Sequence, residues 1–98
     1  MLTIDEIRTL VVPLVKAYPV RRVILFGSYA RGTATEHSDV DLIIDSDGQL
    51  NGFDFFGIIG DIAKKMPIEV DVFEFGEVKK PSNMFDSIVK EGVVIYER

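Results

Sequence analysis

Short strand-like runs alternate with segments of helical periodicity along the whole of this 98-residue chain. Residues 23–26 are a continuous apolar run bounded by arginines and a glycine, which is typical of a buried strand. Residues 40–44 give a second strand, residues 68–75 alternate apolar and polar side chains, and residues 93–96 form a last apolar run. This alternation predicts a small α/β fold.

Residues 4–17 repeat apolar side chains at helical spacing, so we expect an amphipathic helix before the first strand. Thr3 and Glu6 have the spacing of a capping box, which fixes where this helix begins. Pro13 removes a backbone hydrogen bond, so the sequence predicts a bend or an early end.

Two longer helices and one short one are expected between the strands. A short helical turn over residues 28–33 follows the first strand. Residues 51–65 form a helix whose inward face we predict from Phe53, Phe56, Ile59, Ala63 and Met66, with Phe55 pointing elsewhere and available to a partner. Residues 82–91 form the last helix, with Phe85, Ile88 and Val89 inward and Gly92 as its end. The elements form one domain, residues 1–98, without repeats or linkers.

Composition excludes several classes of protein. The chain has no cysteine, which excludes disulfides, zinc–thiolate sites and thiol catalysis. It has neither a signal peptide nor an apolar run of the roughly 20 residues that a membrane span needs, so we expect a cytoplasmic protein without a membrane partner. A net charge of −5 argues against nucleic acid as a primary ligand, because nucleic-acid binding normally needs a basic surface.

Gly27 and Ser28 lie where the first strand turns into the short helix. The first backbone N–H groups of a helix have no acceptor within it and favour a phosphate. Gly27 permits close approach to the ligand and Ser28 adds a hydroxyl. A tight turn with a helix cap explains the same two residues, so the pair alone does not establish a phosphate site.

Asp39 and Asp41 follow Ser28 after an interval of ten residues. Residues at this i, i+2 spacing on a strand share a face and lie roughly 6.5 Å apart. The apolar residues that follow place the pair beside the core, where carboxylates need a cation. The cation is either a divalent metal that also holds nucleotide phosphates or Arg31 in an internal ion pair.

Asp71 is the predicted third carboxylate, at the centre of the strand over residues 68–75. If this strand pairs beside residues 40–44, Asp71 lies roughly 4.8 Å across from the Asp39 and Asp41 face. Three acids could then hold two Mg²⁺ ions about 3.5–4 Å apart. Glu69 shares the face and is the alternative to Asp71.

Two further polar residues lie near the motif. Arg31 is three residues after Ser28, on the same side of the short helix, where it could contact phosphate or an aspartate. His37 could ligate metal, although a lone loop histidine is more often a bystander.

The pattern Gly27-Ser28, ten residues, Asp39-Val40-Asp41 resembles the signature of the polymerase β-like nucleotidyltransferase superfamily, in particular its minimal nucleotidyltransferases. The resemblance implies a small mixed β-sheet flanked by helices. It also implies Mg²⁺-dependent transfer of a nucleoside monophosphate, with ATP as the expected donor. By position, Gly27 and Ser28 would bind the triphosphate, Asp39 and Asp41 would bind Mg²⁺, and Asp71 matches the third carboxylate.

Many minimal members of this superfamily act as antitoxins beside an all-helical HEPN-type protein, in studied cases by adding AMP to a tyrosine of the toxin. The resemblance therefore implies an enzyme that modifies a hydroxyl of a HEPN-type partner. A non-catalytic module that neutralises a partner by contact, and a transferase acting on RNA or a small molecule, are the alternatives.

Overall fold

In the computed structural model, which describes residues 1–78 and 80–98, four strands alternate with helices in the predicted order. The elements are α1 (Ile4–Val15), β1 (Arg22–Phe26), α2 (Ser28–Arg31), β2 (Val40–Asp45), α3 (Gly52–Lys65), β3 (Val70–Glu74), the 3₁₀ turn η1 (Phe75–Glu77), α4 (Asn83–Glu91) and β4 (Val93–Glu97). The predicted α/β class is confirmed.

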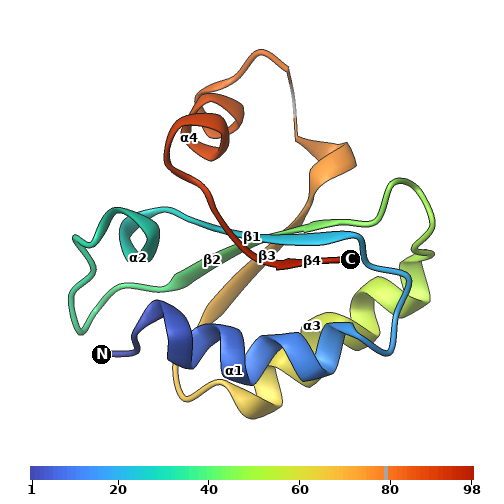
Figure 1. The fold of residues 1–98 in the computed structure, drawn as a ribbon, viewed down its shortest axis with the longest axis horizontal. Coiled ribbons are helices and arrows are strands. Elements are labelled where there is room, and N and C mark those ends of the chain that lie inside the picture. The colour runs from blue at the N-terminus through green and yellow to red at the C-terminus, as the bar shows by residue number, and fades with distance from the viewer. Residues whose placement is uncertain (79) are drawn as a thin grey trace.

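The strands form one mixed sheet in the order β3-β2-β1-β4. β1 pairs antiparallel with β2 and with β4, whereas β2 and β3 run parallel. Helices α1 and α3 cover one face of the sheet, and α4 and η1 stand over the other (Figure 1). The short helix α2 lies at the end of the sheet where β1 finishes and β2 begins.

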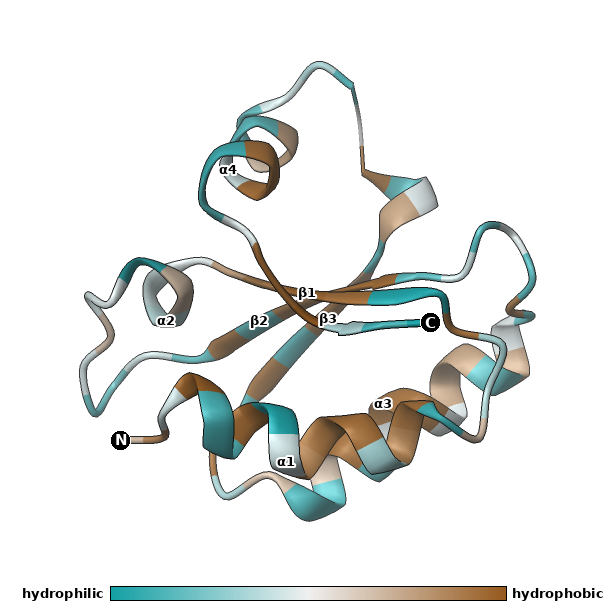
Figure 2. Cartoon of the chain, viewed as in Figure 1, coloured by the Kyte–Doolittle hydropathy of each residue, from teal (hydrophilic) through white to brown (hydrophobic). Residues whose placement is uncertain are grey.

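Side-chain alternation along the strands divides the core into two layers. Leu42 and Ile44 of β2 face α1 and α3, where they join the larger cluster of buried residues. Ile43 faces the other way and packs with Ile24, Phe26 and Ile88 beneath α4. Figure 2 shows the middle of β1 and β2 as the most hydrophobic part of the sheet. The central strands are therefore covered on both faces, as their apolar composition predicts.

Local signals placed the helix starts correctly. The backbone N–H of Thr3 donates to Glu6 at 2.9 Å and that of Glu6 donates to the Thr3 hydroxyl at 3.0 Å, which is the expected capping box. The helix contains Pro13 and ends at Val15, so the predicted early end is confirmed. Asn51 caps α3 by accepting the Asp54 N–H at 2.8 Å.

The predicted inward face of α3 is wrong in phase, and that of α4 is right for Ile88 but wrong for Val89. Phe53 and Phe56 are 91% and 73% exposed, whereas Phe55, which was expected to point elsewhere, packs against the core. The buried residues of α3 are Ile58 and Ile62. On α4, Val89 is exposed and Ile88 is buried. Spacing gives the period of a helix, but contacts with the rest of the fold decide its rotation.

None of the helices in the two described stretches has the length and hydrophobicity that crossing a bilayer requires.

Candidate nucleotide-transfer site

The phosphate-binding turn predicted from the sequence lies at the end of β1. Gly27 has φ 75° and ψ −155°, a conformation essentially restricted to glycine. Its carbonyl accepts the N–H groups of Ala30 and Arg31, both at 3.1 Å, and thereby starts α2 directly after the strand. A Cβ atom on Gly27 would collide with Oδ2 of Asp41. The missing side chain therefore brings the turn against the carboxylate.

Asp41 and Asp71 are direct neighbours across the parallel β2–β3 pair. Asp41 is also paired with Phe26 on β1, the residue that precedes Gly27. Residues paired across a sheet project to the same face. The turn, Asp41 and Asp71 therefore form a row across three adjacent strands, on the face that α4 partly covers. The conditional prediction that the third strand pairs beside the second is confirmed.

Electrostatics couples all three predicted acids. Burial raises the pKa of Asp41 above its ordinary value, the negative charges of Asp71 and Asp39 raise it further, and the positive charge of Arg31 opposes them. Asp39 is exposed and precedes β2, so it is not part of the strand as the spacing suggested. Glu69 precedes β3, where its carbonyl accepts the Val40 N–H at 3.0 Å, and Asp71 takes the place opposite Asp41.

Arg31 does not form the internal ion pair with the aspartates that was the alternative explanation of the motif. Its Nη1 atom donates to Oε2 of Glu91 at 3.1 Å, and Ser87 Oγ lies 3.3 Å from the same oxygen. Both partners of the Arg31–Glu91 pair are partly exposed. No pattern in the sequence predicts this contact, because Glu91 is 60 residues away on α4. The contact keeps the arginine near the row of acids without neutralising them.

His37 lies on the loop before β2, with its side chain 88% exposed and Nε2 3.6 Å from Glu36 Oε1. The contact with Glu36 does not link His37 to the row of acids.

The donor set of the row fits Mg²⁺. Carboxylate oxygens are ligands that this ion prefers, and it is usually held by one or two carboxylates together with substrate phosphates rather than by an all-protein cage. Over residues 1–78 and 80–98, no three His, Cys, Asp or Glu side chains are arranged as a ready-made metal site. Asp39 and Asp71 are exposed, and exposed side chains change rotamer within nanoseconds. The row fits an ion that arrives with a nucleotide.

Comparison with known proteins agrees with this geometry. The family "Polymerase beta, Nucleotidyltransferase" matches residues 11–98. A protein of Methanocaldococcus jannaschii is 32% identical over 85 residues, which cover 83% of this chain and 87% of the relative's chain. Its name gives protein adenylyltransferase as a provisional activity. The protein adenylyltransferase MntA of Thermococcus cleftensis is 43% identical over 49 residues, which cover 46% of this chain and 50% of its own.

Solved structures share the fold. A chain of a toxin–antitoxin crystal structure with AMP-PNP superposes with a TM-score of 0.77 and 18% identity, covering 93% of this chain and 73% of that one. A chain from the complex of a tri-AMPylated Shewanella oneidensis HEPN toxin with its MNT antitoxin superposes with a TM-score of 0.73 and 14% identity. The match covers 98% of this chain and 74% of that one. At these identities the likeness concerns the fold.

Proposed function

Because the chain belongs to the polymerase β nucleotidyltransferase family, we propose that it transfers AMP from ATP to a hydroxyl group of a protein partner. The observation that carries the proposal is the row formed by the Gly27 turn, Asp41 and Asp71 across β1, β2 and β3. Burial and the negative charges of Asp71 and Asp39 keep the pKa of Asp41 raised, and the Arg31 side chain is paired with Glu91 rather than with Asp41. A partly buried carboxylate in this position is suited to a cation that comes with the substrate.

The order of the row suggests how the residues divide the reaction. Gly27 and Ser28 bind the β- and γ-phosphates, and Arg31 supports them from the same short helix. Asp39, Asp41 and Asp71 would hold Mg²⁺, two ions by analogy with the family, and the metal would neutralise charge on the phosphates. An in-line displacement puts the attacking group opposite the leaving group. The acceptor hydroxyl therefore approaches from the side of Asp71, on the edge strand β3.

In the transfer step, the hydroxyl oxygen forms a bond to the α-phosphorus while the bond to the bridging oxygen breaks. Pyrophosphate leaves over the Gly27 turn, and the proton of the hydroxyl passes to the nearest carboxylate, which we assign to Asp71. The product is an AMP ester of the acceptor.

A HEPN-type toxin is the partner we propose. Both relatives named above carry the name protein adenylyltransferase, one of them provisionally, and the fold neighbours come from toxin–antitoxin complexes, one with an AMPylated HEPN toxin. This chain would then act as an antitoxin in the cytoplasm.

The test is labelling with α-³²P-ATP and Mg²⁺ in the presence of a co-purified helical partner. Wild-type protein should label the partner, whereas Asp39→Asn/Asp41→Asn should not. Gln49→Ala, a change at an exposed position in the loop after β2, is the matched control and should label normally. Neutralisation of the toxin by the double variant without any labelling would instead support a binding module that acts by contact.

A further inference from the structure

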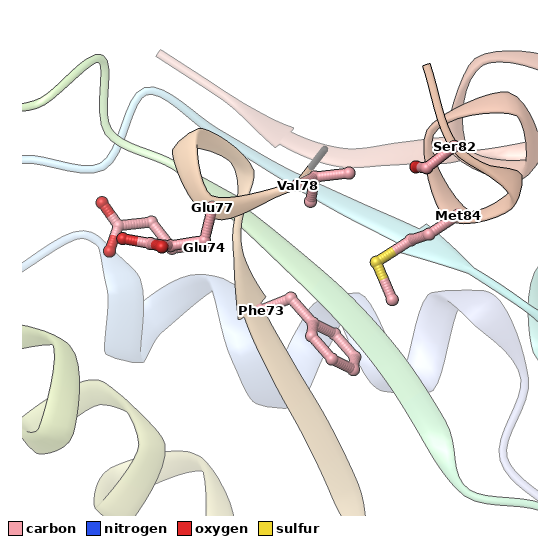
Figure 3. Close-up of a pocket in the computed structure, with 6 residues that line it drawn as sticks. All are labelled: Phe73, Glu74, Glu77, Val78, Ser82 and Met84. Atoms are coloured by element: carbon pink, nitrogen blue, oxygen red, sulfur yellow. The ribbon is translucent and has the colours of Figure 1, made fainter. Parts of the chain in front are cut away.

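A pocket of about 350 Å³ opens on the same face of the sheet as the row of acids, between β3, η1 and α4 (Figure 3). Its volume is within the range of small-molecule sites. It is lined by Phe73, Glu74, Glu77, Val78, Ser82 and Met84.

The walls of the pocket suit a flat aromatic group. The ring of Phe73 and the thioether of Met84 point toward one another across the opening, and Val78 lies above them (Figure 3). Aromatic rings stack on other rings, and a methionine sulfur packs favourably against them. A planar heterocycle can therefore be held between β3 and α4.

The pocket is continuous with the phosphate turn. Phe73 is two residues after Asp71 on the same face of β3, a separation of roughly 6.6 Å along a strand. Its ring also packs against Phe26, with centroids 5.8 Å apart, and Phe26 directly precedes Gly27. A nucleotide with its phosphates on the turn can reach the pocket without leaving this surface.

The charged groups at the pocket select the kind of heterocycle. The carboxylates of Glu74 and Glu77 stand together at one end, on the side away from Met84 (Figure 3). Ionised carboxylates only accept hydrogen bonds. They match the amino groups that adenine, guanine and cytosine carry on their edges and that uracil lacks.

We propose that this pocket binds the base of the substrate nucleotide and selects an amino-substituted base such as adenine. The inference rests on the proposed function and adds to it the place of base recognition and the residues that recognise the base. Phe73 and Met84 hold the faces of the base, and Glu77 recognises its edge.

The experiment compares ATP with inorganic tripolyphosphate, which has the phosphates but no base. Dissociation constants of both are measured by calorimetry with Mg²⁺ for wild type, Met84→Trp and Val89→Trp. Met84→Trp fills the pocket, whereas Val89→Trp places the same new side chain at an exposed position of the same helix. We expect Met84→Trp to weaken ATP binding at least tenfold without affecting tripolyphosphate binding. Val89→Trp should change neither dissociation constant.

A second variant tests the recognised edge. Glu77→Gln replaces an acceptor-only group with an amide that also donates, so the preference for ATP over UTP should fall several-fold while tripolyphosphate binding stays the same. Unchanged ATP affinity in Met84→Trp overturns the inference, and if labelling of the partner is lost at the same time, the pocket belongs to the acceptor. Equal weakening of ATP and tripolyphosphate binding in Met84→Trp, with an unchanged ratio of ATP to UTP affinity in Glu77→Gln, overturns it as well.

Failure of the proposed function gives a different result. Wild-type protein would then bind neither ATP nor tripolyphosphate. If wild-type protein binds ATP and tripolyphosphate equally well, the phosphate site stands and only the assignment of the base pocket is overturned.

Discussion

Replacing Gly27 by alanine tests the contact between the turn and Asp41. The backbone at φ 75° and ψ −155° costs a residue with a side chain about 1–3 kcal/mol, so the free energy of unfolding should fall by about 2 kcal/mol. For a domain of this size each kcal/mol lowers the melting temperature by about 4–8 °C, which predicts a fall of roughly 8–16 °C. A domain of about 100 residues has about 5–15 kcal/mol of stability, so the variant still folds.

Activity should fall much further than stability. The new Cβ collides with Oδ2 of Asp41 and moves the carboxylate, and displacing a reacting group by about 1 Å can cost about 100-fold in rate. We therefore expect AMP transfer to the partner to drop about 100-fold, measured by labelling at a temperature well below the melting point of the variant.

Gly32→Ala is the matched control for this prediction. Gly32 also has a positive φ of 79°, but nothing in the described residues lies within 4 Å of a Cβ built there. The left-handed conformation should cost about 1–2 kcal/mol and leave the transfer rate near that of wild type. If Gly27→Ala transferred AMP as fast as Gly32→Ala, the turn would not be built around Asp41, and the site assignment would be refuted.

Three further predictions concern charge and capping. Asp41→Asn should abolish transfer but raise the free energy of unfolding at pH 7, because the folded state disfavours the negative charge of Asp41. This gain in stability, measured by urea unfolding, should shrink as the pH falls toward the ordinary pKa of 3.8, where the wild-type carboxyl takes up its proton. Arg31→Gln should change stability by less than about 1 kcal/mol, since its pair with Glu91 is partly exposed, but it should weaken ATP binding; unchanged binding in calorimetry would reduce Arg31 to a structural partner of α4. Asn51→Ala should cost about 1 kcal/mol by removing the α3 cap, with no effect on labelling.

The parts of the site that are local in sequence could be predicted from it. The Gly27 turn needs only a strand followed at once by a helix, and the acids of β2 lie at a fixed distance from it in the chain. The alternation of β3 predicted which face Asp71 occupies, whereas its place beside Asp41 was predicted only on the condition that β3 pairs with β2. Chain-local patterns therefore located most of the row.

The rotation of α3 could not be predicted, because it depends on a contact between distant segments. Gly57 lies against Tyr18, whose hydroxyl would be 2.9 Å from a Cβ at that position and is hydrogen-bonded to Asp61 at 3.2 Å. With Gly57 against Tyr18, the buried residues of α3 are Ile58 and Ile62. The base pocket depends on tertiary structure in the same way, since α4 supplies one wall and β3 the other.

The two aspartates of β2 explain why the site needs a ligand. Asp45 and Asp41 are on the same strand and the same face, four residues apart. Burial alone would raise the pKa of Asp45. Hydrogen bonds from Arg22 and the Asp47 N–H, together with the positive charges of Arg22 and Arg21, instead lower this pKa. Arg22 Nη2 lies 2.8 Å from Asp45 Oδ2.

Asp41 has no such ion pair within residues 1–78 and 80–98, and its pKa is raised. The fold thus neutralises one carboxylate internally and leaves the other, beside Asp71 and Asp39, to a cation from outside. If the proposed function holds, such a cation binds the folded state and relieves repulsion between the acids, so Mg²⁺ together with ATP should raise the stability of the chain.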